Sequence, residues 1–174
     1  MTAGAYQTNV PSQMDRLDFV RVFGGVYEHS PWIAEQVFDK RLVKIHNNAV
    51  DLHFAMASVV EFADKEQKLL LLRAHPDLAG KLAISGELTE DSTSEQASAD
   101  LGNCTAEEFA AFQSLNDQYK EKFGFPFILA VRGYHRAEIL EIFRQRVDND
   151  ADTEFDEALT QVHRIALLRL KAIT

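Results

Sequence analysis

The sequence predicts an all-α fold, in the form of a single compact domain of about seven or eight helices. Apolar residues recur at intervals of three and four along most of the 174-residue chain, and helix-capping sequences precede several of these stretches. No alternating strand pattern and no hairpin signal is present. Hydrophobic residues make up 46% of the chain and charged residues 26%. This is enough apolar material for a core, and it excludes general disorder.

The chain begins with a stretch that predicts little regular structure. Residues 1–13 are mostly small or polar, so we expect a flexible N-terminal tail before a helical domain over residues 14–174. The first helix is expected from about Asp15. The apolar positions that follow it have helical spacing: Leu17, Val20, Phe23 and Tyr27. Gly24-Gly25 interrupts this spacing and predicts a kink or a close packing contact.

Three more helices are expected in the first half of the chain. Ser30-Pro31 has the residue types of an N-cap and a first helical position, and it predicts a short helix that reaches Phe38. A third helix is expected over residues 48–62, with four inward-facing side chains: Leu52, Met56, Val59 and Val60. Asp64 begins a variant of the capping box and predicts a fourth helix over residues 65–74.

The second half of the chain predicts further helices around one irregular segment. Residues 77–91 hold glycines and several polar residues, so we expect mostly loop there. Capping boxes at Ser92–Glu95 and Thr105–Glu108 each predict a helix start, and Gly124 is well placed to end the second of these helices. The apolar run 125–131 is too short for a helix, and we expect buried, irregular backbone. Two last helices are expected, over residues 137–147 and 153–171.

The charge balance and the cysteine content exclude several classes of protein. Lys and Arg number 18 and Asp and Glu number 27, which gives a formal net charge of −9. Such a chain repels phosphate backbones, so we expect no nucleic-acid partner. The purely apolar runs are too short to span a membrane. Cys104 is the single cysteine, which excludes an internal disulfide and a thiolate zinc cluster and suits a reducing, cytoplasmic location.

A metal site is also not expected. His46 and His53 are seven residues apart and could share a helix face. No third ligand stands in an evident motif, so the spacing favours an ordinary helix face over metal binding.

His75-Pro76-Asp77 is the first candidate for chemistry. Pro76 disfavours helical backbone at His75 and so places the histidine at a helix end, on stiff backbone. An imidazole, with an ordinary pKa of about 6.5, can donate or accept a proton at neutral pH. The alternative is a histidine that caps the helix by interacting with its dipole. The residues alone leave both open.

Five polar side chains follow one another at an expected helix start: Ser92, Thr93, Ser94, Glu95 and Gln96. The N–H groups at a helix N-terminus receive anions or carbonyl oxygens, and Glu95 could accept an N–H group from a ligand. Ser92 and Glu95 also form a capping box, which needs no ligand. The spacing alone favours the cap.

Arg169 occupies a position in the apolar seam of the last expected helix. The other members of this seam are Phe155, Leu159, Val162, Ala166 and Ile173. A guanidinium group keeps its charge in a core and therefore needs a carboxylate. That carboxylate could come from the protein or from a substrate, and the spacing leaves both open.

The apolar run 125–131 can contribute chemistry only through its backbone. Buried irregular backbone has N–H and C=O groups that must find partners, and a flat, amide-rich ligand could supply them. The alternative is a packed connecting segment.

Five ordered motifs together resemble one family. They are Arg73-Ala-His-Pro-Asp-Leu-Ala-Gly-Lys81, Leu88-Thr89 with Ser92-x-x-Glu95-Gln96, Leu115-Asn-x-x-Tyr119, Lys122-Phe-Gly-Phe-Pro-Phe-Ile128 with Ala130-Val-Arg132, and Leu168-Arg-Leu170. Over about residues 17–172 the chain resembles the OHCU decarboxylases, which act on 2-oxo-4-hydroxy-4-carboxy-5-ureidoimidazoline (OHCU) in the ureide pathway of urate breakdown. The resemblance implies an all-helical, cofactor-free enzyme, usually homodimeric, that makes (S)-allantoin from OHCU.

The resemblance also implies roles for individual residues. His75 and Glu95 take the catalytic positions. The substrate-binding positions are Pro76, Ser92, Thr93, Ser94, Glu95, Gln96, Phe127, Ile128, Leu129, Ala130, Val131 and Arg169. After the Glu-Gln pair the family commonly has Ala-Gly, where this chain has Ala99-Asp100. We expect this departure to change the local backbone and not the chemistry.

Two functions of other classes are the alternatives. His-Pro-Asp also occurs in J-domain co-chaperones, and a helical interaction module of that kind predicts an exposed His75 and no small-molecule pocket. There the motif lies beside a basic helix in a much shorter domain, which does not fit this acidic chain. A metal-dependent hydrolase on a helical bundle predicts stoichiometric bound metal.

Overall fold

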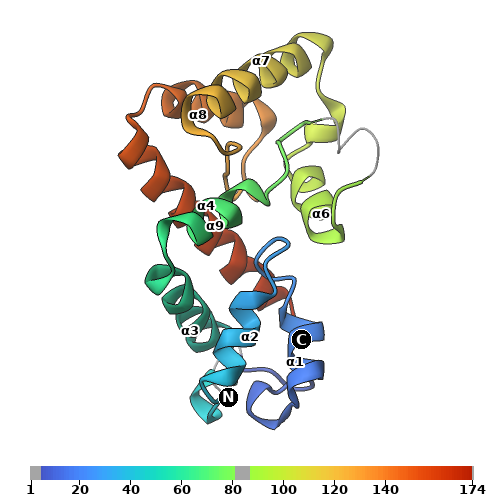
Figure 1. Cartoon of the computed structure of the whole chain (residues 1–174). Helices are drawn as coiled ribbons and strands as arrows, with labels where there is room; N and C mark the ends of the chain where they lie inside the picture. The colour runs from blue at the N-terminus through green and yellow to red at the C-terminus, as the bar shows by residue number, and fades with distance from the viewer. Residues whose placement is uncertain (1–4, 81–86, 174) are drawn as a thin grey trace. The chain divides into compact units, whose positions relative to one another are not determined.

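The fold is all α-helical (Figure 1). The computed structural model describes residues 5–80 and 87–173. These residues contain eight α-helices, three 3-10 helices and no strand, and one isolated backbone pair joins Ala5 to Asn48. The α-helices are α1 (Arg16–Phe23), α2 (Trp32–Asp39), α3 (Ala49–Phe62), α4 (Lys65–Arg73), α6 (Glu90–Ser98), α7 (Ala106–Phe123), α8 (Arg136–Val147) and α9 (Ala151–Ala172). The predicted all-α fold of seven or eight helices is confirmed within this part of the chain.

The chain packs as two compact units. The first runs to Ala74 and includes the residues from His163 onward, and the second spans His75–Val162. Helices α1 to α4 and the last turns of α9 belong to the first unit, whereas α6 to α8 and the first turns of α9 belong to the second. The predicted division into a tail, 1–13, and one domain, 14–174, stays a prediction.

Residues 5–13 make specific contacts inside the first unit. Tyr6 is buried, its hydroxyl donates to the carbonyl of Leu170 at 3.1 Å, and its ring meets that of Phe23 edge-on. Ser12 donates its N–H to the side-chain oxygen of Asn47 and accepts from the Asn47 amide, both at 2.9 Å. These contacts join the described part of this stretch to the rest of the first unit. The flexibility of this stretch stays a prediction.

Polar side chains mark the starts of three helices in the first unit. Asp15 accepts a backbone N–H group at the start of α1, Asn48 does so for α3 and Asp64 for α4. The four side chains of α3 that were predicted to face inward, Leu52, Met56, Val59 and Val60, are buried. In α1 the buried residues are Phe19 and Phe23, whereas Leu17 is 80% exposed. The spacing in α1 located the helix but not its buried face.

The second unit is built around α7 and α8, which pack side by side (Figure 1). The predicted capping box of Thr105 and Glu108 begins α7, and Gly124 ends it with a φ of 78°, in the left-handed region that suits glycine. Residues 126–131 have no regular secondary structure, and within 125–131 every residue except Ala130 is buried. The predicted stretch of buried irregular backbone is confirmed.

The start of α6 differs from the predicted one. This helix begins at Glu90, and the Thr89 hydroxyl accepts the N–H of Ser92 at 3.3 Å. Glu90 and Asp91 place two carboxylates in the first turn, where the helix dipole favours them. The predicted helix start at Ser92 is therefore wrong. Of the expected loop 77–91, residues 81–86 lie outside the described residues.

Two further helix starts differ by one or two residues. Helix α2 begins at Trp32, with Pro31 in the N-cap position and no side-chain cap. Helix α9 begins at Ala151 rather than at Thr153. Asp150, the residue just before Ala151, caps the helix, because its carboxylate accepts the N–H of Thr153 at 2.9 Å.

Candidate active site

The turn that follows α4 carries the first predicted catalytic residue. His75 lies two residues beyond the end of α4 and is partly buried, as is Pro76. Ala79 has a φ of 48°, in the left-handed region that residues other than glycine rarely adopt. A Cβ atom on Gly80 would lie 2.7 Å from the Cβ of Asp77, so only glycine fits there without a shift. His75 therefore adjoins a tight and strained turn, residues 77–80.

Helix α6 holds this turn through Gln96. The side-chain amide of Gln96 accepts the N–H of Ala79 at 3.1 Å and donates to the carbonyl of Asp77 at 3.3 Å. Gln96 is buried, and both ends of its amide are bonded to the turn. The role of Gln96 in binding substrate stays a prediction, and its role in holding the turn is observed.

The rest of the polar run lies inside α6 rather than at its start. Ser92 is buried, Glu95 is partly buried, and Thr93 and Ser94 are exposed. Glu95 and Gln96 lie three and four residues after Ser92, so the three side chains share one face of the helix. Because α6 begins at Glu90, the N–H of Ser92 is bonded to the Thr89 side chain, and the N–H groups of residues 93–96 are interior helix groups.

Helix α7 holds the same turn with three further side chains: Gln113, Asn116 and Lys120. The amide of Gln113 donates to the carbonyl of Ala79 at 2.8 Å, and the amide of Asn116 donates to the carbonyl of Leu78 at 3.0 Å. The ammonium group of Lys120 lies 2.6 Å from a carboxylate oxygen of Asp77. The carbonyls of residues 77, 78 and 79 thus all accept hydrogen bonds from side chains.

The irregular segment 126–131 has both satisfied and unsatisfied backbone groups. The carbonyl of Ile128 accepts from Arg146 at 2.7 Å, and the N–H of Ala130 donates to Gln161 at 3.1 Å. No hydrogen bond joins the N–H or C=O groups of Phe127 and Leu129 to any other residue of the described chain. Both residues are nevertheless buried. Buried backbone groups that have no partner among the described residues are suited to pair with a ligand or with water.

A buried polar network fixes Arg146 beside this segment. Its guanidinium donates to a Glu154 oxygen at 2.9 Å and at 2.5 Å, and the Tyr119 hydroxyl donates to the same oxygen. Asn149 donates to the other oxygen of Glu154 at 2.9 Å. Burial, together with the hydrogen bond to Glu154, raises the pKa of Tyr119 well above its ordinary value. The tyrosine therefore stays a neutral donor in this network.

Arg169 finds a carboxylate within the protein. Its Nη1 atom lies 2.6 Å from Oε2 of Glu28, and the two residues are 6% and 2% exposed. The neighbouring His29 has a φ of 47°, and its Nε2 atom is 4.0 Å from the other Glu28 oxygen. Arg169 and Glu28 belong to the first unit, whereas the turn at His75, α6 and the segment 126–131 belong to the second. Binding of substrate by Arg169 stays a prediction.

Asp100 stands where the family commonly has glycine, and its backbone conformation is one that favours glycine. Its φ is 58°, in the left-handed region that glycine adopts most readily. Aspartate tolerates this region better than most residues do. Its carboxylate accepts from Asn103 at 2.6 Å and pairs with Arg136. The Asn103 hydrogen bond and the Arg136 charge lower the pKa of Asp100. The backbone thus accommodates the substitution, and the aspartate gains two partners.

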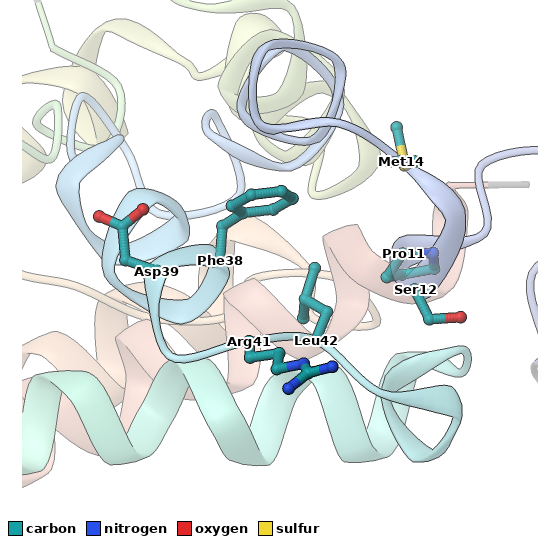
Figure 2. Close-up of a pocket in the computed structure, with 7 residues that line it drawn as sticks. All are labelled: Pro11, Ser12, Met14, Phe38, Asp39, Arg41 and Leu42. Carbon is teal, nitrogen blue, oxygen red and sulfur yellow. The ribbon is translucent and has the colours of Figure 1, made fainter.

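The described residues line at least two hollows, one in each unit. The hollow of the second unit has a volume of about 440 Å³ and is lined by Ala79, Leu101, Gly102, Cys104, Thr105, Ala106 and Phe109. Figure 2 shows the hollow of the first unit, about 300 Å³, where residues 38–42 lie opposite residues 11–14. None of the predicted site residues lines either hollow, although Ala79 belongs to the turn next to His75.

The histidines weighed as metal ligands bond to other groups. His46 accepts the N–H of Val43 at 3.1 Å, and Nε2 of His53 lies 2.9 Å from the carbonyl of His163. Within the described ranges no group of three or more His, Cys, Asp or Glu side chains is placed to hold a metal ion. No helix in these ranges reaches the length and apolarity needed to cross a membrane.

Sequence reasoning missed several residues of this arrangement. Glu28, Gln113, Lys120 and Gln161 were not singled out, and Asn116 was named only within the motif Leu115-Asn-x-x-Tyr119. The polar Asn116 among aromatic seam positions of α7 was a usable signal. Glu28 has no comparable signal, because its partner is 141 residues away in the sequence.

Comparison with known proteins decides the family. The family model described as OHCU decarboxylase matches residues 12–171. The chain belongs to the OHCU decarboxylase family. It is 44% identical over 161 residues to the 2-oxo-4-hydroxy-4-carboxy-5-ureidoimidazoline decarboxylase of Haloferax volcanii, and the match covers 91% of this chain and 92% of that relative. The enzyme of the same name from Halalkalicoccus jeotgali is 40% identical, with 94% and 89% covered.

Longer relatives and solved structures agree with this assignment. The uric acid degradation bifunctional protein of Bacillus subtilis is 38% identical over 93% of this chain, which matches 31% of that protein. A crystal structure of (S)-allantoin synthase superposes with a TM-score of 0.74 at 33% identity, and it covers 93% of this chain and 52% of that one. A more distant OHCU decarboxylase structure, 22% identical with a TM-score of 0.65, supports the fold.

Proposed function

We propose that this protein decarboxylates OHCU to (S)-allantoin in urate degradation. The observation that carries the proposal is the family match over residues 12–171, together with relatives of the same name that this chain covers almost end to end. Many of the residues that the family resemblance implicates lie on irregular backbone, His75 and Pro76 and residues 127–131, or on one face of α6, as Ser92, Glu95 and Gln96 do. Such places suit ligand binding better than regular, exposed helix does.

The reaction needs a place for the electron pair that the departing CO2 leaves behind. Many decarboxylases obtain this electron sink from a bound cofactor. In OHCU the carbon that bears the carboxylate and the hydroxyl adjoins a C=N bond of the ring, which can take up the pair. We therefore expect a cofactor-free reaction, in which the protein supplies orientation, charge placement and proton handling.

His75 is the proposed acid–base residue. It contacts the hydroxyl and the carboxylate at the reacting carbon and directs proton transfer as CO2 leaves. Its position at the end of α4, followed by a held turn, limits the directions in which the imidazole can point. Pro76 lies beside the ligand and keeps the backbone stiff.

The polar face of α6 and the segment 127–131 hold the flat ring of the substrate. Glu95, with Ser92 and Gln96 on the same face, accepts N–H groups of the ureido arm or of the ring. Backbone groups of Phe127 and Leu129, which have no partner within the described ranges, pair with ring carbonyl and N–H groups. A ring held on both edges exposes one face to the proton, and this gives a single enantiomer.

Arg169 binds a substrate oxygen in this proposal. The family resemblance gives it this role, and the buried carboxylate of Glu28 neutralises its charge and fixes one of its nitrogens. Thr93, Ser94, Ile128, Ala130 and Val131 complete the proposed binding set.

The working enzyme is proposed to be a cytoplasmic homodimer. The family resemblance implies the dimer, and exposed apolar side chains of the first unit support it. Phe54 and Phe62, eight residues apart on α3, are 74% and 87% exposed. Val43, Ile45, Val50 and Leu70 are exposed as well. Monomeric soluble proteins rarely leave large apolar patches uncovered.

The proposed reaction is tested by product chirality. OHCU is generated immediately before use and mixed with the protein without added metal or cofactor, and (S)-allantoin is followed by circular dichroism. Spontaneous decay of OHCU yields racemic allantoin, so a growing dichroic signal identifies catalysis. We expect His75→Asn to lower the rate by at least about 10²–10⁴-fold with the fold intact.

Three results would count against this proposal. Racemic product from the wild-type protein would refute the activity and favour a helical interaction module. Loss of activity with chelator, with recovery on adding metal, would favour the metal-dependent alternative. Wild-type turnover by His75→Asn would refute the role of the histidine.

A further inference from the structure

The turn beside His75 is held more firmly than its short length requires. The carbonyls of three successive residues, 77, 78 and 79, accept hydrogen bonds from side chains of two helices. The N–H of Ala79 is bonded as well, to the Oε1 atom of Gln96. One backbone feature of this turn is unfavourable by itself, the left-handed φ of Ala79, and a Cβ atom at position 80 would lie too close to Asp77. Strained backbone persists only where its surroundings determine it strongly.

The three residues of α7 that contact this turn form one polar stripe. Gln113, Asn116 and Lys120 follow each other at intervals of three and four, which places them on one face of the helix. Asn116 is 2% exposed. Its Nδ2 atom donates to Leu78, while its Oδ1 atom has no hydrogen-bond partner within the described part of the chain. Burying an amide with one unpaired end costs free energy. The hydrogen bond to Leu78 therefore has to offset that cost.

We propose that the α7 stripe of Gln113, Asn116 and Lys120 is a positioning device for His75. Pro76 is the only residue between His75 and Asp77, and its ring fixes its φ. The direction of the His75 side chain therefore follows from where residues 77–79 are held. None of the three stripe residues is a substrate ligand in this proposal. They act through the backbone of the turn, and the inference rests on the proposed function of His75.

The alternative is that the stripe only satisfies buried carbonyl groups and so stabilises the fold. The two roles differ in what they do to catalysis. A misplacement of a catalytic group by about 1 Å can lower a rate by about 10²-fold. A change of this kind lowers kcat and leaves KM unchanged, because substrate binding is not affected. Loss of stability alone changes neither constant of the folded fraction.

The test uses three variants of the full-length protein: Gln113→Leu, Asn116→Leu and Lys120→Met. Each is assayed for (S)-allantoin formation from fresh OHCU, with kcat and KM determined separately and with thermal unfolding measured on the same samples. We expect kcat to fall by about 10–10²-fold for Gln113→Leu and Asn116→Leu at unchanged KM. Lys120→Met should lower kcat by less, since the ion pair of Lys120 with Asp77 is partly exposed. Lys120→Arg keeps the charge and should have wild-type activity.

The matched control lies on the same helix. Among the described residues, the Gln118 side chain has one hydrogen bond, to the Ser114 hydroxyl at 2.9 Å, and both residues are exposed. Gln118→Leu should leave kcat and KM unchanged. As a readout that needs no substrate, the NMR signals of the His75 imidazole, assigned with His75→Asn, should shift in Gln113→Leu and stay in place in Gln118→Leu.

The outcomes separate this inference from the proposed function. Folded Gln113→Leu and Lys120→Met proteins with wild-type kcat and unshifted His75 signals would overturn the positioning role and leave the decarboxylase assignment intact. An inactive wild-type protein would overturn the decarboxylase assignment, and the NMR comparison would still decide whether the stripe sets the imidazole. If Asn116→Leu does not fold, the other two variants decide.

Discussion

Replacing Glu28 tests the buried ion pair that holds Arg169. The carboxylate and the guanidinium are 2.6 Å apart, and their side chains are 1% and 5% exposed. Removing one partner breaks a buried ion pair, which destabilises a protein by about 3–5 kcal/mol. In a chain of this size each kcal/mol moves Tm by about 2–4 °C, so Glu28→Ala should lower Tm by about 6–20 °C.

The assay is thermal unfolding for Tm and urea unfolding for the free energy, both followed by tryptophan fluorescence. Trp32 is the single tryptophan of the chain and lies at the start of α2, in the same unit as the pair. The matched control is Asp39→Asn, which removes a surface ion pair with Arg16 whose side chains are 50% and 59% exposed. Exposed pairs contribute little, so the control should unfold at nearly the wild-type urea concentration.

A double variant separates stability from binding. In Glu28→Leu/Arg169→Leu both charges are absent, and apolar replacements of a buried pair are often neutral or stabilising. We therefore expect the double variant to regain most of the lost free energy of unfolding but to stay inactive as a decarboxylase. A Glu28→Ala protein within about 1 kcal/mol of wild type would refute the reasoning about burial. A fully active double variant would refute substrate binding by Arg169.

Two further predictions concern pH and assembly. Burial lowers the pKa of His163, although Glu61 beside it acts in the opposite sense, and burial also lowers the pKa of His53. The unfolded chain then binds more protons than the native one as pH falls below about 6.5, so the free energy of unfolding should fall there by up to about 1.4 kcal/mol per pH unit and per histidine. Between pH 5 and 7.5 the urea midpoint of His163→Gln should depend less steeply on pH than that of the wild-type protein. An equal dependence in the two proteins would contradict this. Phe54→Asp should convert the proposed dimer to a monomer in light scattering, whereas Leu17→Asp, at another exposed apolar position of the same unit, should not; a dimeric Phe54→Asp protein would exclude this face.

Local signals predicted most of the helices because each signal and its partner lie within one turn. Asp64 and Thr105 cap helices by bonding N–H groups three residues ahead. The buried face of α3 follows from spacing alone. The same logic misplaced the start of α6, because Thr89 and Ser92 are both good capping residues and the acidic side chains between them favour the earlier start.

The candidate site was only partly predictable, because its decisive contacts join distant parts of the chain. The sequence indicated that Arg169 needs a carboxylate, but nothing near it in the sequence points to Glu28. Asn116 lies among aromatic positions of α7, but its bond to the carbonyl of Leu78 depends on how the turn folds back on α7. Long-range partners of this kind follow from tertiary packing and not from local propensity.

The two irregular segments of the second unit differ in a way that assigns them different tasks. In the turn 77–80, side chains of α6 and α7 satisfy three successive carbonyls, so this backbone has little left to offer a ligand. In the segment 126–131, side chains satisfy Ile128 and Ala130 but leave the backbone of Phe127 and Leu129 without partners among the described residues. Since buried backbone groups must be paired, the second segment is the one that should bind the ring. The first should aim the histidine.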